Sequence, residues 1–139
     1  MEQRDYLLRQ IELMTQAFVS LIRRLLGLKE LTEEEIEQTT DEVLKEQLDM
    51  SISQVLENNY NKLVDLIISK KGIHIPNVEL LAEILVINAH ARKDAGQKTD
   101  LYKKALELYE WLDKKGDTFS MERHKKMKEL RFLLSEKTE

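Results

Sequence analysis

The segment from Val78 to Ala91 constrains the fold most, because it is apolar on nearly every side. Its only polar positions are Glu79, Glu83, Asn88 and His90. A surface helix buries one stripe, whereas a helix that is apolar all round must be covered by neighbours on more than one face. Pro76 lies just before it, and proline is accepted within a first helical turn but not further along. The sequence therefore predicts a central helix that begins at this proline.

The rest of the chain favours helices as well. Hydrophobic residues make up 42% and charged residues 35% of the 139 residues, with only 4 Gly and 1 Pro. Such a composition is rich in helix formers and poor in turn formers, and this length is enough for one hydrophobic core. We therefore expect an all-α fold, a single helical domain of about six helices over residues 1–139.

The spacing of apolar residues places the other helices. An amphipathic helix is expected over 5–26, an acidic helix over 33–48, and further helices over 60–70, about 100–114 and about 120–135. Thr32 followed by Glu35, and Ser51 followed by Gln54, are capping-box patterns that mark helix starts. A loop over 94–98 is expected to join the central helix to the next one.

Residues 78–134 resemble a degenerate tetratricopeptide unit, in which two antiparallel helices are followed by a third at the start of the next repeat. Ala105 followed by Tyr109 matches the repeat's small-then-aromatic pattern, and a turn at 114–117 falls where the repeat ends. The first helix lacks the repeat's Trp-x-x-Leu-Gly-x-x-Tyr pattern, and the expected 94–98 connection is longer than the repeat's. The resemblance implies a right-handed hairpin with a capping helix over 78–135, and a concave surface of the kind that binds proteins.

Two short segments, 5–11 and 106–112, together resemble small bacterial proteins of an uncharacterised helical family. That resemblance implies no function. The chain has no cysteine, which suits a reducing compartment, and its start lacks the basic and apolar regions of a secretory signal. No apolar run approaches the roughly 20 residues that a membrane span needs. We therefore expect a cytoplasmic protein that does not enter a membrane.

No group of residues has the spacing of a catalytic, cofactor or metal site. The three histidines, His74, His90 and His124, form no ligand pair, and the four glycines are isolated near expected helix ends, so no phosphate loop is present. His90 is interpreted as a local partner of Asp94, four residues on. The sequence thus predicts no enzyme, no cofactor and no metal. An unrecognised activity stays open as an alternative, and a polar pocket joining His90, Glu83 and Asn88 would favour it.

Charge is divided unevenly along the chain, although the formal net charge is only −4. Between Glu30 and Glu57, ten acidic side chains accompany the single base Lys45, whereas between Arg123 and Arg131 five basic side chains accompany one acid. The basic last helix provides a second alternative, a regulator that contacts nucleic acid phosphates. The acidic net charge and the lack of interleaved aromatic side chains argue against it.

The preferred hypothesis is a noncatalytic interaction or scaffold module. A groove between the Val78–Ala91 hairpin and its neighbours would accept a peptide, a helix or a second copy of the chain. The long N-terminal helix would either close the core or pair with its twofold mate in a homodimer. The candidate partner-binding side chains are Trp111, Tyr102, His90, Arg123 and Lys126.

Overall fold

The computed structural model describes residues 2–27, 30–57, 63–70, 73–116 and 120–137, and every regular element among them is helical. The elements are α1 (Glu2–Leu25), α2 (Glu33–Leu48), α3 (Ile52–Glu57), a π-helix (Asp65–Lys70), α5 (Ile75–Ala91), α6 (Ala95–Lys115) and α7 (Met121–Lys137). The predicted all-α fold is confirmed. Among the helices described, none is both long and apolar enough to cross a membrane.

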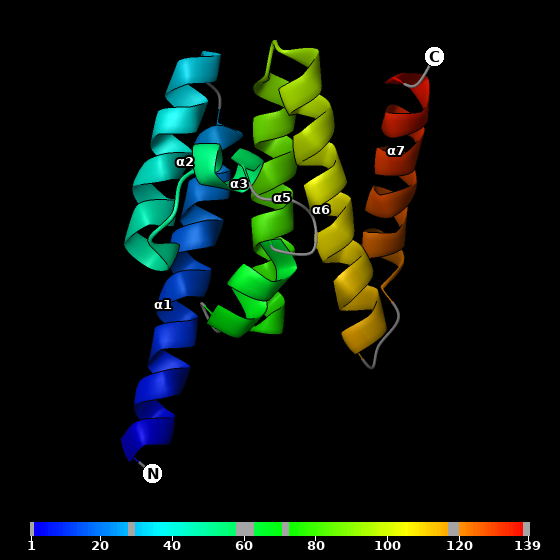
Figure 1. Cartoon of the computed structure of the whole chain (residues 1–139). Coiled ribbons are helices and arrows are strands. Elements are labelled where there is room, and N and C mark those ends of the chain that lie inside the picture. Colours follow the sequence, from blue (N-terminus) through cyan, green and yellow to red (C-terminus); the bar gives the residue numbers. More distant parts are fainter. Residues whose placement is uncertain (1, 28–29, 58–62, 71–72, 117–119, 138–139) are drawn as a thin grey trace.

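The helix α5 lies at the centre of the fold, as its all-round apolar character predicts. It packs against α1 and α2 on one side and forms an antiparallel hairpin with α6 on the other, while α7 packs on α6 (Figure 1). The short α3 contacts both α2 and α6. Buried apolar side chains from all of these elements form one hydrophobic core.

The helix α1 is buried along only part of its length. Phe18, Leu21 and Leu25 belong to the core, whereas residues 3–10 are all exposed. In Figure 1 the N-terminal part of α1 extends beyond the ends of the neighbouring helices. The C-terminal half of α1 therefore closes the core, and its N-terminal half projects from it.

The capping patterns of the sequence form as predicted. The backbone N–H of Glu35 donates to Thr32 Oγ1 and the N–H of Thr32 donates to Glu35 Oε1, each at 3.1 Å, so α2 begins at residue 33. The same reciprocal pair joins Ser51 and Gln54 in front of α3. These bonds satisfy amide groups that the first turn of a helix leaves without an intrahelical partner.

The expected loop over 94–98 is wrong. Asp94 is the N-cap of α6, since its Oδ2 accepts a hydrogen bond from the N–H of Gln97 at 2.9 Å. The helix therefore begins at Ala95 and includes Gly96 in its first turn. The connection from α5 to α6 is therefore only Arg92–Asp94.

The helix expected over 60–70 is described only in its second part. Residues 58–62 lie outside the described residues, 63 and 64 are helical, and Asp65–Lys70 form the π-helix. Leu63 and Ile67 from this segment are buried in the core. The segment thus contributes apolar side chains to the core as its pattern predicts, with a wider helical turn than an α-helix.

Two buried asparagines hold α5 against its neighbours. The hydroxyl of Thr15 on α1 donates to Asn77 Oδ1 at 2.6 Å, and Asn88 Nδ2 donates to Thr40 Oγ1 on α2 at 3.0 Å. Hydrogen bonds between buried polar side chains are sensitive to position, so they fix the register of packed helices more sharply than apolar contacts do. The position of α5 is therefore specified against α1 near its start and against α2 near its end.

Candidate partner-binding groove

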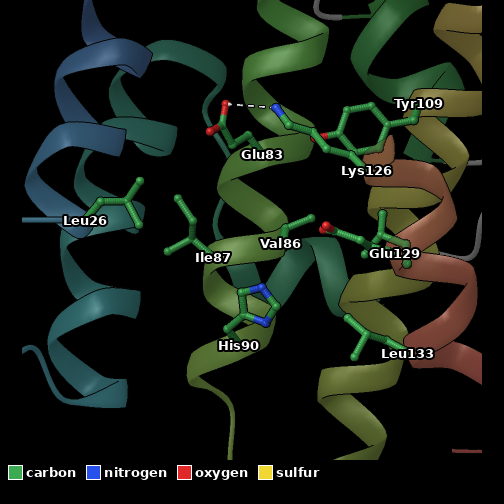
Figure 2. A pocket seen from close by; sticks show the side chains of 10 residues that line it. Leu26, Glu83, Val86, Ile87, His90, Tyr109, Lys126, Glu129 and Leu133 are labelled. Atoms are coloured by element: carbon green, nitrogen blue, oxygen red, sulfur yellow. Dashed lines mark ion pairs between the residues drawn. The ribbon is translucent and has the colours of Figure 1, made fainter. Parts of the chain in front are cut away.

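A groove runs over one face of α5, between the end of α1 and the helix α7. Figure 2 shows Leu26 on one side, Val86 and Ile87 of α5 in the middle, and Glu129 and Leu133 of α7 on the other side. It encloses a volume of about 250 Å3. The lining residues are Leu26, Glu83, Val86, Ile87, His90, Tyr109, Lys126, Glu129, Leu130 and Leu133.

The floor of the groove is an uncovered strip of the central helix. The helices α1, α2 and α6 pack on the other sides of α5, but Val86 and Ile87 stay only half-buried. Leu26, just beyond α1, is 63% exposed at the edge. The apolar side chains of Val86 and Ile87 pack against the core in part and stay partly accessible from the groove.

The apolar surface continues past both ends of the groove. Leu31 and Ile36, at the start of α2, line a second hollow that shares Leu26 and Ile87 with the groove. At the other end, Phe132 of α7 is 62% exposed in a hollow that adjoins the groove. A continuous apolar strip with polar edges thus crosses the molecule from α2 to α7, and such strips mark interaction sites on protein surfaces.

Charged and polar side chains form the rim. Lys126 of α7 and Glu83 of α5 form an ion pair at 4.0 Å, drawn as a dashed line in Figure 2. Burial raises the pKa of the Tyr109 hydroxyl, and the charges of Glu83 and Glu79 raise it further. The phenol of Tyr109 therefore stays neutral at physiological pH and gives the groove wall an uncharged hydroxyl.

His90 lies at the end of the groove, and a side chain of α6 holds its ring in place. Its Nδ1 is hydrogen-bonded to the hydroxyl of Tyr102 on α6 at 2.6 Å, and the two rings meet edge to face with centroids 5.4 Å apart. The predicted pairing of His90 with Asp94 is therefore wrong, because Asp94 lies beyond the end of α5 and caps α6. Tyr102 is itself buried and fixes the direction of the imidazole.

The environment of His90 predicts a pH-dependent contribution to stability. Partial burial lowers the pKa of His90 below the ordinary 6.5, the nearby charge of Lys98 lowers it further, and Glu129 opposes them. Because the folded state favours neutral imidazole, this contribution is present above pH 6.5 and is lost as the pH falls from 6.5 towards the folded-state pKa.

We expect His90→Gln to flatten the dependence of the free energy of unfolding on pH in this window. Urea unfolding of both proteins between about pH 5 and pH 8 measures this difference. An NMR titration of the His90 ring provides the control, and a pKa at or above 6.5 would contradict the prediction.

The structure separates the five candidate side chains that the sequence suggested. His90 and Lys126 line the groove, and Tyr102 is buried behind His90. Trp111 is half-buried elsewhere, in a hollow that it shares with Val64 and Asp65 beside the π-helix. Arg123 is buried between α6 and α5, where it contacts Asp113 Oδ1 at 3.2 Å and Glu79 Oε1 at 3.4 Å.

The three side chains that would favour an enzyme do not meet in one polar pocket. His90 and Glu83 face the groove, whereas Asn88 is buried and donates its hydrogen bonds to Thr40 and to the carbonyl of Ile84. Within the ranges that the structure describes, no three histidine or acidic side chains are grouped so that they could hold a metal ion. The polar pocket that would favour an enzyme is therefore not formed by these three side chains.

Much of the basic charge of α7 is directed at carboxylates of the molecule itself. Besides the contacts of Arg123 and Lys126, His124 Nε2 lies 2.8 Å from Asp113 Oδ2, and Arg131 pairs with Glu110 at 3.6 Å. Side chains already paired in this way are less available to phosphate groups.

The groove was only partly visible in the sequence. Its polar members His90 and Lys126 are among the candidates from the sequence, whereas its apolar members Val86 and Ile87 belong to the segment for which the sequence predicts cover on several faces. Their common signal is that α5 carries more apolar surface than its neighbours can cover.

Comparison of the chain with protein-family models, with curated proteins and with solved structures finds no match.

Proposed function

We propose that this protein is a noncatalytic interaction module that holds an apolar segment of a partner protein in the groove over α5. The observation that carries the proposal is the partly exposed floor at Val86 and Ile87, on a helix that is covered on its other sides. Leaving these side chains in water costs free energy that a partner can recover by covering them. The resemblance of residues 78–134 to a tetratricopeptide unit supports the same role, because such units form concave binding surfaces.

The groove suits an amphipathic helix of the partner. A helix laid in an apolar groove contributes side chains spaced three and four residues apart, and the apolar strip from α2 to α7 offers successive contacts for them. At the rim, Glu83 is held by Lys126, whereas Glu129 has no ion pair within the described part of the chain. We therefore expect the partner segment to carry a basic residue beside its apolar anchors.

The same proposal places the protein and its partner in the cytoplasm. The support is the absence of cysteine from all 139 residues, which suits a reducing compartment where disulfides do not persist.

The test is a peptide selection followed by titration against matched variants. Peptides selected from a displayed random library against the full chain are expected to bind Ile87→Asp at least roughly thirtyfold more weakly, the loss typical of an interface hot spot. Leu26→Asp, at the exposed edge, should also weaken them. The control is Leu13→Asp, because Leu13 is exposed on α1 outside the groove.

Circular dichroism spectra establish that each variant is folded before binding is compared. The wild-type chain and Ile87→Asp are then used as paired baits in an extract of the native cells, and a true partner is retained by the first and lost from the second. Selected peptides that lose affinity equally for Leu13→Asp and Ile87→Asp would contradict the proposal.

A further inference from the structure

The first three turns of α1 form a second exposed apolar surface, separate from the groove. Tyr6 is 67%, Leu7 51% and Leu8 50% exposed, although each is a large apolar side chain. They lie towards the end of α1 that extends beyond its neighbours in Figure 1, where Leu7 lines a hollow with Glu46 of α2 and His74. The groove lies at the opposite end of α1, where Leu26 forms its edge.

The buried face of α1 continues into this projecting part without a break. Its apolar residues recur at alternating intervals of four and three, at Leu7, Ile11, Met14, Phe18, Leu21 and Leu25. This is the spacing of a helix that packs along another helix. The last three are buried, but Ile11 and Met14 are only half-buried and Leu7 is half-exposed. This row of apolar residues on α1 therefore extends further along the helix than the neighbouring helices that cover it.

The charges on the projecting part of one copy are complementary to those on the same part of a second copy. Arg4, Leu8 and Glu12 follow one another at four-residue intervals, so they form one row along the helix, and all three are exposed. If two such helices lie antiparallel about an axis through Leu8, Arg4 of each copy faces Glu12 of the other. Neither Arg4 nor Glu12 has an ion pair within the residues that the structure describes.

We propose that two copies of the chain associate through the first three turns of α1, antiparallel and centred on Leu8. Leu7 and Leu8 supply the apolar contact, and the reciprocal pairs of Arg4 with Glu12 set the direction and register. A projecting segment of about ten residues is about 15 Å long, so the interface is smaller than the roughly 800 Å2 per partner of a standard complex. The dimer is therefore weak and reversible, with a dissociation constant in the micromolar range or above, and it leaves both grooves open.

The test reverses the charge of Arg4 or Glu12. Sedimentation equilibrium of the full chain, at concentrations up to about 1 mM, measures the average mass. The wild-type mass should rise from monomer towards dimer with concentration. Arg4→Glu gives an all-acidic row and Glu12→Arg an all-basic one, and each creates two like-charge contacts. Each variant alone should therefore dimerise at least roughly tenfold more weakly.

An equimolar mixture of Arg4→Glu and Glu12→Arg should associate again, because the acidic row of one faces the basic row of the other. High salt should weaken this mixed dimer by screening. Arg23→Glu, at an exposed position near the far end of α1, is the control and should leave dimerisation unchanged.

A wild-type mass that stays monomeric throughout this range would overturn the proposal. A dimer that persists in Leu8→Asp would overturn it as well, since association would then use another surface. Failure of the two charge-reversed variants to associate when mixed would exclude the antiparallel register. The variant Ile87→Asp is expected to dimerise normally, which keeps this result separate from the function of the groove.

Discussion

Replacing Phe18 with alanine is expected to lower the free energy of unfolding by about 3–5 kcal/mol. Phe18 is fully buried where α1 meets the core. Its truncation removes the apolar transfer free energy of the ring and leaves a cavity that the surrounding helices fill only in part. Urea or guanidinium unfolding followed by circular dichroism measures the difference.

Tyr6→Ala is the matched control for this prediction. It truncates another aromatic side chain on the same helix, but Tyr6 lies on the projecting part, so its loss should change the free energy of unfolding by less than about 0.5 kcal/mol. Measurements at low protein concentration keep the control independent of association. Equal destabilisation by both substitutions would contradict the division of α1 into a buried half and a projecting half.

A second large effect is expected at Lys104, where Lys104→Met should lower the free energy of unfolding by about 2–3 kcal/mol. The Lys104 side chain is 1% exposed, and its Nζ donates to the carbonyls of Val55 at 2.6 Å and Leu56 at 3.0 Å. It also pairs with Asp100 Oδ2 at 2.7 Å. Methionine fills the space of the aliphatic stem but leaves the carbonyls at the end of α3 without their donor.

The loss should be concentrated in α3. A helix of six residues is too short to be stable by itself, so it depends on contacts with the rest of the fold. Hydrogen exchange of the α3 amides in Lys104→Met provides a local readout besides global unfolding. Lys103→Met is the control, since the neighbouring Lys103 is exposed, and comparable destabilisation by both variants would contradict the role given to Lys104.

The sequence is informative wherever structure follows from local pattern. The capping box at Thr32 and Glu35 gives the start of α2 directly, because both partners lie within four residues of each other. The excess of apolar residues between Val78 and Ala91 predicts a central helix, because burial on several faces is the only way to remove so much apolar surface from water. The start of α6 is different, because Gly96 favours a loop by type whereas Asp94 caps the helix in front of it.

The parts that could not be predicted depend on contacts between distant segments. Lys104 falls on the buried stripe of α6 between Leu101 and Leu108, and its ammonium is satisfied there by Asp100 of the same helix together with carbonyls at the end of α3. A lysine on such a stripe, with an aspartate four residues before it, was the one available signal. The groove also depends on contacts between distant segments. The apolar pattern of α5 predicts that neighbouring helices cover this helix, but it does not show which of its side chains they leave partly exposed.

The separations along the chain between packed helices also determine the order in which the molecule assembles. The helices α5 and α6 pack against each other across the short Arg92–Asp94 connection, whereas the contact of α1 with α5 joins segments about fifty residues apart. Closing a long loop costs more conformational entropy than closing a short one, so contacts between sequence neighbours form first. The C-terminal hairpin is thus expected to act as the folding nucleus, and α1 docks onto it later. During folding, the floor of the groove on α5 is therefore formed before Leu26 takes its place at the edge.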